Sequence, residues 1–283
     1  MRAFSADSHP GHRRSHNEDC YRANPELGLW LVADGVGGHS NGEVAAAIVR
    51  DTLDRDVARG SSLIEAIHHS HSSILQEIAG RAGSNMGSTV VALQLNGDDY
   101  EIAWVGDSRA YLFDGSSLKQ VTRDHNPVSE MLARGAITPE QAANHPERNV
   151  LSQSLGVADS ITVAPDRIRG TLNAGEQVLL CSDGLSDELA DEDISRLMAE
   201  ADDPQAQVAK LIEAALAAGG RDNITVIVVG EKAQPGQAPL ARRQGDTLSH
   251  EQAVSVDNGS GHDKMVLALL GAMVLLALLW MLW

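Results

Sequence analysis

The chain has 283 residues, which is enough for one large domain with additional segments or for two small domains. Hydrophobic residues make up 43% of it and support a sizeable core, although only 3% are aromatic. The formal net charge of −17 at pH 7 argues against nucleic acid as a partner, because nucleic acids are themselves negative. The same charge would repel a phosphate-bearing substrate unless bound divalent cations offset it locally.

Up to residue 230 the sequence predicts one globular domain. Apolar runs bounded by turn signals predict strands at Arg2–Asp7, Gly28–Asp34, Thr89–Leu95, Tyr100–Val105, Ala110–Phe113, Ile161–Asp166, Gln177–Ser182 and Ile224–Val229. Helices are expected at Gly42–Val57, Leu63–Ile78, Val128–Arg134, Pro139–Asn144, Asp193–Ala199 and Gln205–Ala218. Because strands and helix pairs come in blocks, we expect a layered α+β fold rather than a doubly wound parallel sheet.

The remaining residues have a different composition. Residues 231–264 are rich in Gln, Gly, Pro, Ser and charge, which predicts a flexible linker. Residues 265–283 form an uninterrupted apolar run that, as a helix, would span about 28 Å, close to the roughly 30 Å hydrocarbon core of a membrane. Trp280 and Trp283 suit an interfacial belt, and basic residues flank only the N-terminal side. We therefore expect a single-pass transmembrane helix, a tail anchor in the cell inner membrane with the 1–230 domain in the cytoplasm, rather than a buried core helix.

Carboxylates recur beside the predicted strands, and this is the strongest functional signal in the sequence. Asp34-Gly35 ends the apolar run 29–33, where a carboxylate can leave the core and face a ligand. A similar position, at the end or start of a predicted strand, is occupied by Glu18-Asp19, Asp107, Asp183-Gly184 and Asp222-Asn223. Taken singly, each acid reads as a turn residue or a helix cap, but the recurrence points to a shared role. Carboxylates gathered at one end of a sheet repel one another without cations, and oxygen ligands favour Mg²⁺ or Mn²⁺ over zinc. We expect Asp34 to be the central carboxylate of a multi-metal site.

These acids belong to an ordered series of motifs. The series reads Gly11-x-x-Arg14-x-x-Asn17-Glu18-Asp19, Ala33-Asp34-Gly35-Val-Gly-Gly38-His39, Gly87-Ser-Thr89, Val105-Gly106-Asp107-Ser108-Arg109, Ser182-Asp183-Gly184-Leu185 and Arg221-Asp222-Asn223-Ile-Thr225. It resembles the PPM family, the metal-dependent protein serine/threonine phosphatases also called type 2C, over about residues 1–230. The segment 123–150 is similar to the flap of the family's bacterial branch. The resemblance implies a four-layer α-β-β-α sandwich with a dinuclear metal site at one end.

The resemblance also implies which residues hold two Mn²⁺ or Mg²⁺ ions. Asp34 would bridge both ions. Glu18 and the carbonyl of Gly35 would serve one of them, while Asp183 and Asp222 would serve the other. A weaker third ion would be held by Asp107 together with Asp183.

The catalytic residues implied by the same match are Arg14, Asp19 and His39. Arg14 would grip the substrate phosphate, and Asp19 would order a water bound to the ions. Two cations about 3.5–4 Å apart lower the pKa of a shared water, which would then attack phosphorus in line without a serine or cysteine nucleophile. His39 is the nearest proton donor by sequence for the leaving alkoxide, although a turn residue that caps the following helix fits it equally well. Animal members carry a His directly after Asp-Gly, where this chain has Val36.

The sequence leaves three functions open. The leading one is a protein phosphatase that acts on phosphoserine and phosphothreonine in phosphorylated proteins, and the resemblance alone adds a cognate Ser/Thr protein kinase as a partner. An ATPase of the histidine-kinase type also uses Asp-x-Gly-x-Gly, but it needs an upstream helix with Glu and Asn, whereas Asn17-Glu18 lies a short turn ahead of a strand. A catalytically silent scaffold that binds phosphoproteins at the membrane is the third, and the intact acids and Arg14 argue against it.

Overall fold

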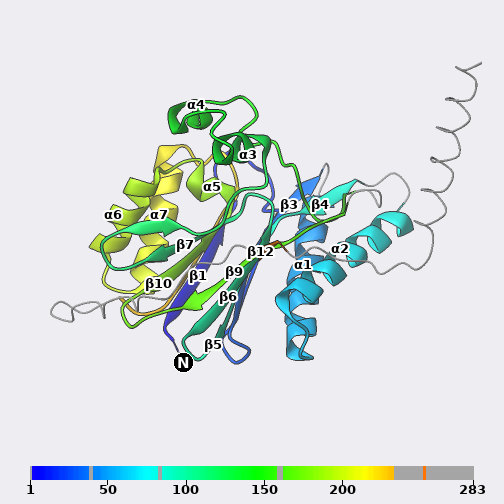
Figure 1. Ribbon diagram of the computed structural model, residues 1–283, viewed down its shortest axis with the longest axis horizontal. Helices are drawn as coiled ribbons and strands as arrows, with labels where there is room; N and C mark the ends of the chain where they lie inside the picture. The colour runs from blue at the N-terminus through cyan, green and yellow to red at the C-terminus, as the bar shows by residue number, and fades with distance from the viewer. Residues whose placement is uncertain (1, 38–40, 82–84, 158–161, 233–250, 253–283) are drawn as a thin grey trace, which may run out of the picture. The chain divides into compact units, whose positions relative to one another are not determined.

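The computed structural model describes residues 2–37, 41–81, 85–157, 162–232 and 251–252. The chain divides into two units, Met1–Ala253 and Val254–Trp283, of which the second lies outside the described residues. In the first unit two antiparallel sheets pack face to face, and helices cover the outer face of each sheet (Figure 1).

One sheet has the strand order β1-β11-β10-β7-β8. Its strands are β1 (Phe4–His9), β7 (Arg109–Phe113), β8 (Leu118–Gln120), β10 (Gln177–Cys181) and β11 (Ile224–Val229). Every residue of β11 is buried. Its side chains alternate between two cores, since Val226 and Val228 pack toward helices while Ile227 and Val229 pack toward the other sheet.

The other sheet has the order β12-β9-β6-β5-β3-β2, with β4 paired to β3. Its strands are β2 (Asp19–Asn24), β3 (Leu29–Gly37), β4 (Met86–Ser88), β5 (Val90–Asn96), β6 (Asp99–Val105), β9 (Asp166–Thr171) and β12 (Glu251–Gln252). A two-residue turn joins β5 to β6, because Asn96 pairs with Asp99 and Gly97 has φ of +65°. The sequence Asn-Gly-Asp-Asp at residues 96–99 is typical of such a hairpin turn.

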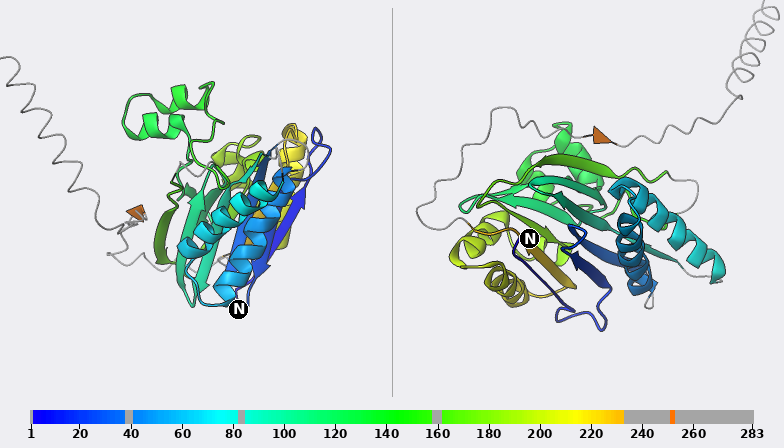
Figure 2. Two further views of the ribbon diagram at one scale, coloured as in Figure 1. Left: turned by 90° about the vertical axis from the view of Figure 1, so that its right-hand side faces the viewer. Right: turned by 90° about the horizontal axis from the view of Figure 1, so that it is seen from below.

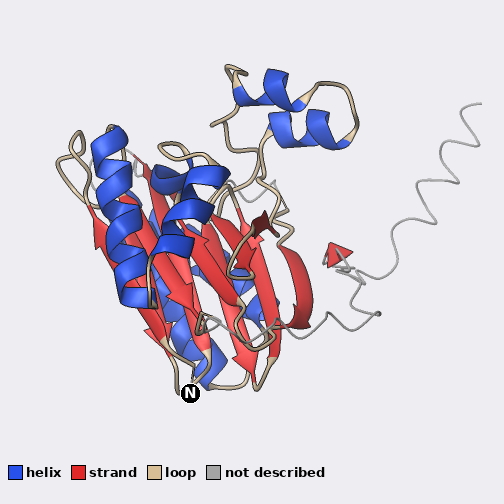
Figure 3. Ribbon diagram, turned by 90° about the vertical axis from the view of Figure 1, so that its left-hand side faces the viewer, coloured by secondary structure: helices blue, strands red, loops and turns tan. Residues whose placement is uncertain are grey.

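The helices in the described residues form three pairs and one short single helix. They are α1 (Asn41–Ala58), α2 (Leu63–Gly80), α3 (Pro127–Ala133), α4 (Pro139–Ala143), α5 (Asp183–Ser186), α6 (Asp191–Glu200) and α7 (Pro204–Ala218). A capping box between Ser62 and Glu65 fixes the start of α2. Seen from below in Figure 2, the pairs α1–α2 and α6–α7 lie on opposite sides of the sheets. Helices α3 and α4 stand together off one end of the sandwich (Figure 3).

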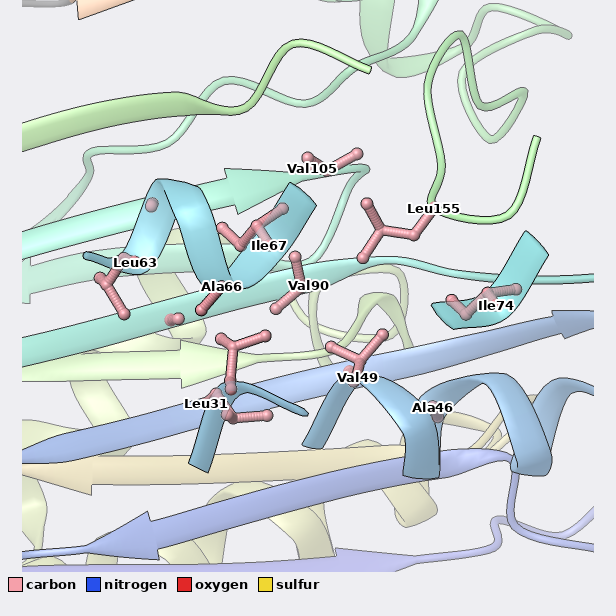
Figure 4. Packing of buried hydrophobic residues seen from close by; sticks show 14 of the residues in the cluster. Leu31, Ala46, Val49, Leu63, Ala66, Ile67, Ile74, Val90, Val105 and Leu155 are labelled. Carbon is pink, nitrogen blue, oxygen red and sulfur yellow. The ribbon is translucent and has the colours of Figure 1, made fainter. Parts of the chain in front are cut away.

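Three apolar clusters hold these layers together. The first joins α1 and α2 to the β3-containing sheet, and Figure 4 shows Leu31 and Val90 of that sheet together with Val49 and Ile67 of the two helices. The second fills the space between the two sheets and includes Trp104. The third joins α6 and α7 to the β11-containing sheet. The expected four-layer α-β-β-α arrangement is therefore confirmed.

One predicted strand was misplaced. Ile161–Asp166 was expected to be a strand, but residues 162–165 are not one, and β9 begins at Asp166. The apolar signal came from Val163, which is buried in a loop. Strand β9 carries few apolar residues, with Ile168 in the core between the sheets, so its periodicity is weak.

The expected membrane anchor at 265–283 lies outside the described residues. In the part of the chain that the structure does describe, no helix has both the length and the apolar character needed to span a membrane. Of the predicted linker at 231–264, only residues 231–232 and 251–252 are described, and the latter pair forms β12 against β9.

Candidate metal and phosphate site

The predicted acids come together where several strands begin or end. Asp34 lies near the end of β3 and is paired in register with Asp19, the first residue of β2. Asp107 follows β6, Asp183 opens α5 just beyond Ser182, which follows the end of β10, and Asp222 precedes β11. Residues from both sheets of the sandwich therefore contribute to one acidic cluster.

The electrostatics of this cluster follow from its burial and its shared charge. Burial raises the pKa of Asp34 well above its usual range, and the charges of Asp19, Asp183, Asp107 and Asp222 raise it further. The pKa of Asp183 is raised well above its usual range in the same way, first by burial and then by Asp107 and Asp222. Carboxylates this close cannot all ionise without a compensating positive charge.

The two carboxylate oxygens of Asp19 differ in their contacts. Its Oδ2 accepts hydrogen bonds from Ser182 Oγ at 2.8 Å and from Thr225 Oγ1 at 2.6 Å. Its Oδ1 is buried and accepts no hydrogen bond among the described residues. Burial raises the pKa of Asp19 to about 6. The two hydroxyl groups thus orient the Asp19 carboxylate and leave the lone pairs of its Oδ1 available to a ligand.

Two hydroxyl residues fix the backbone of Asp34. The amide N–H of Asp34 donates to Thr89 Oγ1 at 3.1 Å, and its carbonyl accepts from the Thr89 N–H at 2.8 Å and from Ser88 Oγ at 3.1 Å. The Thr89 hydroxyl is in turn 2.7 Å from Ser108 Oγ. These contacts explain why Gly87-Ser-Thr89 and Asp107-Ser108 accompany the acids in sequence.

Glu18 and Gly35 meet the start of α1. A Cβ on Gly42 would lie 2.7 Å from the Gly35 carbonyl oxygen and 2.8 Å from Glu18 Oε1. A Cβ on Gly35 would lie 2.1 Å from the Gly42 carbonyl oxygen. Glycine at both positions is therefore required for this close approach, which brings both predicted ligands of one ion to the same spot.

Arg14 lies in the loop before β2, next to the acids. Its Nη2 donates to Asp222 Oδ2 at 2.6 Å. Asn223 holds this loop, because its Oδ1 accepts from the Glu18 N–H at 2.8 Å and its Nδ2 donates to the carbonyls of Pro10 and His16 at 2.9 and 3.0 Å. One amide side chain thus sets the path of the chain from residue 10 to residue 18.

A cavity of about 470 Å³ opens beside the acidic cluster, under α3 and α4. Its lining includes Asp107 and Asp183 from the cluster together with Arg109, Arg148 and Leu132. The side chain of Asn149, which follows α4, donates from Nδ2 to Asp187 Oδ2 at 2.5 Å, so the segment predicted to be the flap contacts the residue just after α5.

The donor atoms and the charge of the acidic cluster determine whether it can bind hard cations. Among the described residues, no three His, Cys, Asp or Glu side chains are already arranged to hold a metal ion. The donors are nonetheless all oxygen, and the buried Oδ1 atoms of Asp19 and Asp183 have no hydrogen-bond partner in the part of the chain that the structure describes. Raised carboxylate pKa values mark surplus negative charge in the cluster. Unused buried lone pairs with surplus negative charge fit Mg²⁺ or Mn²⁺, which take oxygen ligands.

The structure brings nearly all the predicted site residues together. The exception is His39, which lies outside the described residues. Sequence reasoning assigned no task to Ser182, Thr225, Asn223 or Thr89, although each lies within a quoted motif. For Ser182 and Asn223 the available signal was a buried hydroxyl or amide directly beside a predicted ligand. Thr225 lies three positions from Asp222, and Thr89 has no predicted ligand near it in the sequence.

Comparisons with known proteins agree with this geometry. The family model described as Protein phosphatase 2C matches residues 1–131. The serine/threonine protein phosphatase PstP of Mycobacterium tuberculosis is 35% identical over 232 residues, which covers 80% of this chain and 44% of that protein. The serine/threonine phosphatase stp of Listeria monocytogenes is 33% identical over 233 residues, covering 77% of this chain and 92% of that protein.

Solved structures give the same result. The crystal structure of the M. tuberculosis phosphatase PstP/Ppp is similar with a TM-score of 0.75 and 34% identity, covering 82% of this chain and 99% of that one. The catalytic domain of PstP in complex with two manganese ions gives a TM-score of 0.72 and 32% identity, with coverage of 82% and 99%. This chain belongs to the protein phosphatase 2C family of serine/threonine phosphatases.

Proposed function

We propose that this chain hydrolyses phosphoserine and phosphothreonine in phosphorylated proteins, using Mn²⁺ or Mg²⁺. The observation that carries this proposal is the cluster of acids from both sheets with Arg14 beside it. Within the described residues, the buried Oδ1 atoms of Asp19 and Asp183 in this cluster have no hydrogen-bond partner. Family membership supports the same activity, and the crystal structure of the PstP catalytic domain contains two manganese ions. Asn17 and Glu18 lie in the loop before β2 rather than on a helix, which disfavours the ATPase alternative.

The proposed ligands follow the motif match. When bound, the cations would neutralise the acids and supply a nucleophile from water at neutral pH. Asp34 would contact both ions. The other proposed ligands are Glu18 and the Gly35 carbonyl for one ion, Asp183 and Asp222 for the second, and Asp107 with Asp183 for a weaker third.

Three residues are proposed to act on the substrate and on water. Arg14 presents a planar guanidinium to two phosphate oxygens and offsets their charge. Asp19 uses its free Oδ1 to accept a hydrogen bond from the attacking water, while Ser182 and Thr225 hold its other oxygen. His39 is proposed as the proton donor to the leaving alkoxide, since an imidazole titrates in the required range.

The activity is tested with the full chain on a phosphothreonine peptide. We expect phosphate release with Mn²⁺ and none after EDTA is added. Asp34→Ala serves as the comparison, because a catalytically silent scaffold would show the same background rate in both proteins. Absence of metal-dependent turnover on every phosphopeptide tried would reject the proposed function.

We also propose that residues 265–283 anchor the chain in the cell inner membrane, with the phosphatase domain in the cytoplasm and a Ser/Thr protein kinase as its functional partner. The apolar run and its one-sided basic flank support this placement. The full chain should sediment with membranes, and protease added outside intact cells should spare the domain. Digestion of the domain would overturn the orientation.

A further inference from the structure

The loop that carries Arg14 is positive in a negative protein. The chain has 39 Asp and Glu against 22 Lys and Arg, yet residues 8–17 contain no acid. The same ten residues hold Arg13, Arg14, His9, His12 and His16. We call residues 10–16 the cationic loop.

The cationic loop is held in one conformation by its contacts. Asn223 Nδ2 donates to carbonyls at both ends of it, Pro10 and His16. In the middle, the His12 N–H donates to the Gly220 carbonyl at 2.7 Å. Gly11 has φ of +75°, and a Cβ there would lie 2.1 Å from the Asp222 carbonyl oxygen, so the loop packs tightly on the chain before β11. A preformed loop loses little entropy when a substrate binds.

The arginines on and next to the cationic loop differ in whether a carboxylate neutralises them. Arg14 pairs with Asp222. Arg221, which neighbours Gly220, pairs with Glu188, with 2.9 Å between Nε and Oε1. Arg13 is exposed, and its side chain meets no carboxylate among the described residues. Arg13 therefore presents an uncompensated positive charge one residue from the proposed phosphate-binding arginine.

We propose that Arg13 recognises a second anionic group on the substrate, either a carboxylate side chain or another phosphate, close in sequence to the phosphoresidue being hydrolysed. The inference rests on the proposed function and names a substrate class for it. An extended peptide advances about 3.3 Å per residue, so side chains one to three positions from the phosphoresidue lie roughly 3–10 Å from it, which is within reach of the residue next to Arg14. The net charge of −17 repels such acidic peptides elsewhere, so the loop also favours their approach at this place.

The test compares four phosphothreonine peptides and one small substrate on the full chain with Mn²⁺. The peptides carry neutral residues, aspartates, lysines or a second phosphate beside the phosphothreonine, and the small substrate is p-nitrophenyl phosphate, which has no flanking residues. The variants are Arg13→Gln and Arg13→Glu. The matched control is Arg59→Glu, an exposed arginine just beyond the end of α1. Helix α1 has 18 residues and starts beside Gly35, which puts Arg59 about 27 Å from the site.

For the wild type we expect kcat/KM to be about two- to fivefold higher on the aspartate and doubly phosphorylated peptides than on the neutral one, in line with an exposed ion pair. Arg13→Gln should remove this preference, Arg13→Glu should invert it toward the lysine peptide, and Arg59→Glu should leave it unchanged. Raising the salt concentration to about 0.5 M should weaken the wild type's preference for the acidic peptides. Turnover of p-nitrophenyl phosphate should be the same in all four proteins.

Two results would overturn the inference while leaving the proposed function intact. One is a wild type that hydrolyses all peptides with equal kcat/KM. The other is an equal loss on p-nitrophenyl phosphate in Arg13→Gln, which would make Arg13 a ligand of the reacting phosphate. Failure of the wild type to hydrolyse any of these substrates would instead reject the proposed function, and the recognition by Arg13 with it.

Discussion

Arg14 and Asp222 are 208 positions apart in the sequence, and Arg14 Nη2 lies 2.6 Å from Asp222 Oδ2. This contact joins the residue proposed to bind phosphate to one proposed to bind a cation. The carboxylate holds the guanidinium at the edge of the acidic cluster, with half of the Arg14 side chain still exposed. A phosphate arriving there would meet the arginine already in position, which is how preorganised binding saves entropy.

Replacing Arg14 by Ala should lower kcat/KM on a phosphothreonine peptide by roughly ten- to hundredfold. The reason is that a hydrogen bond to a charged group contributes about 1.5–3 kcal/mol. Mn²⁺ affinity, measured by calorimetry, should change little. Arg169→Ala is the control, since Arg169 is an exposed arginine paired with Glu101 in β6. Equal activity losses in the two variants would contradict the assignment of Arg14.

Replacing Asp34 by Asn should have opposite effects on metal binding and on stability. Loss of residues that only support metal ligands lowers affinity 10–100-fold, so loss of a ligand should lower Mn²⁺ affinity by more than about hundredfold. Without metal, however, the variant should melt at a higher temperature than the wild type, because burial and four neighbouring acids disfavour a charge at Asp34. The check is calorimetry and thermal melting in EDTA, with Asp51→Asn on the exposed face of α1 as the control. A metal-free variant less stable than the wild type would refute the repulsion argument.

The metal-free protein should lose stability as the pH rises from about 4 to 7. Burial raises the pKa of Asp19 to about 6, and burial with the Asp124 charge raises that of Asp107 to about 6. Unfolded aspartate has a pKa near 3.9, so between these values the folded protein binds more protons than the unfolded one. The free energy of unfolding therefore falls with pH in this window, by about 2 kcal/mol or more. Urea unfolding in EDTA should show this fall, and saturating Mn²⁺ should abolish it; a flat or rising profile in EDTA would contradict it.

Whether a strand could be predicted from the sequence depended on how completely that strand is buried. The strands β3, β10 and β11 were recognised because both of their faces are covered and their sequences are nearly continuous apolar runs. Strand β2 was missed because its sequence, Asp-Cys-Tyr-Arg-Ala-Asn, is mostly polar and only its first residue is buried. Its position comes from pairing with β3, a tertiary contact that local periodicity does not contain.

The candidate site was predictable to the extent that its residues carry their own signal. The acids stand beside apolar runs and could be read from the sequence. The hydroxyls that orient Asp19 come from Ser182 and Thr225, 163 and 206 positions away, and nothing in those local sequences pairs them with it. The short helix α5 at Asp183 was also missed, since four residues are too few for a helical pattern.

Replacing Thr225 by Val tests whether orientation of Asp19 matters for the reaction. Valine keeps the shape of this fully buried residue but removes the hydroxyl that donates to Asp19 Oδ2 at 2.6 Å. Because that hydrogen bond favours the charged carboxylate, its loss should raise the pKa of Asp19 further and move the acid limb of the pH–rate profile to higher pH. We expect kcat to fall about 10–100-fold, as for residues that support a metal site, with little change in KM. Thr171→Val is the matched control, since Thr171 Oγ1 donates to Asp99 near the hairpin turn between β5 and β6. If the fall in kcat came without any shift of the acid limb, the hydroxyl would be supporting packing rather than the Asp19 carboxylate.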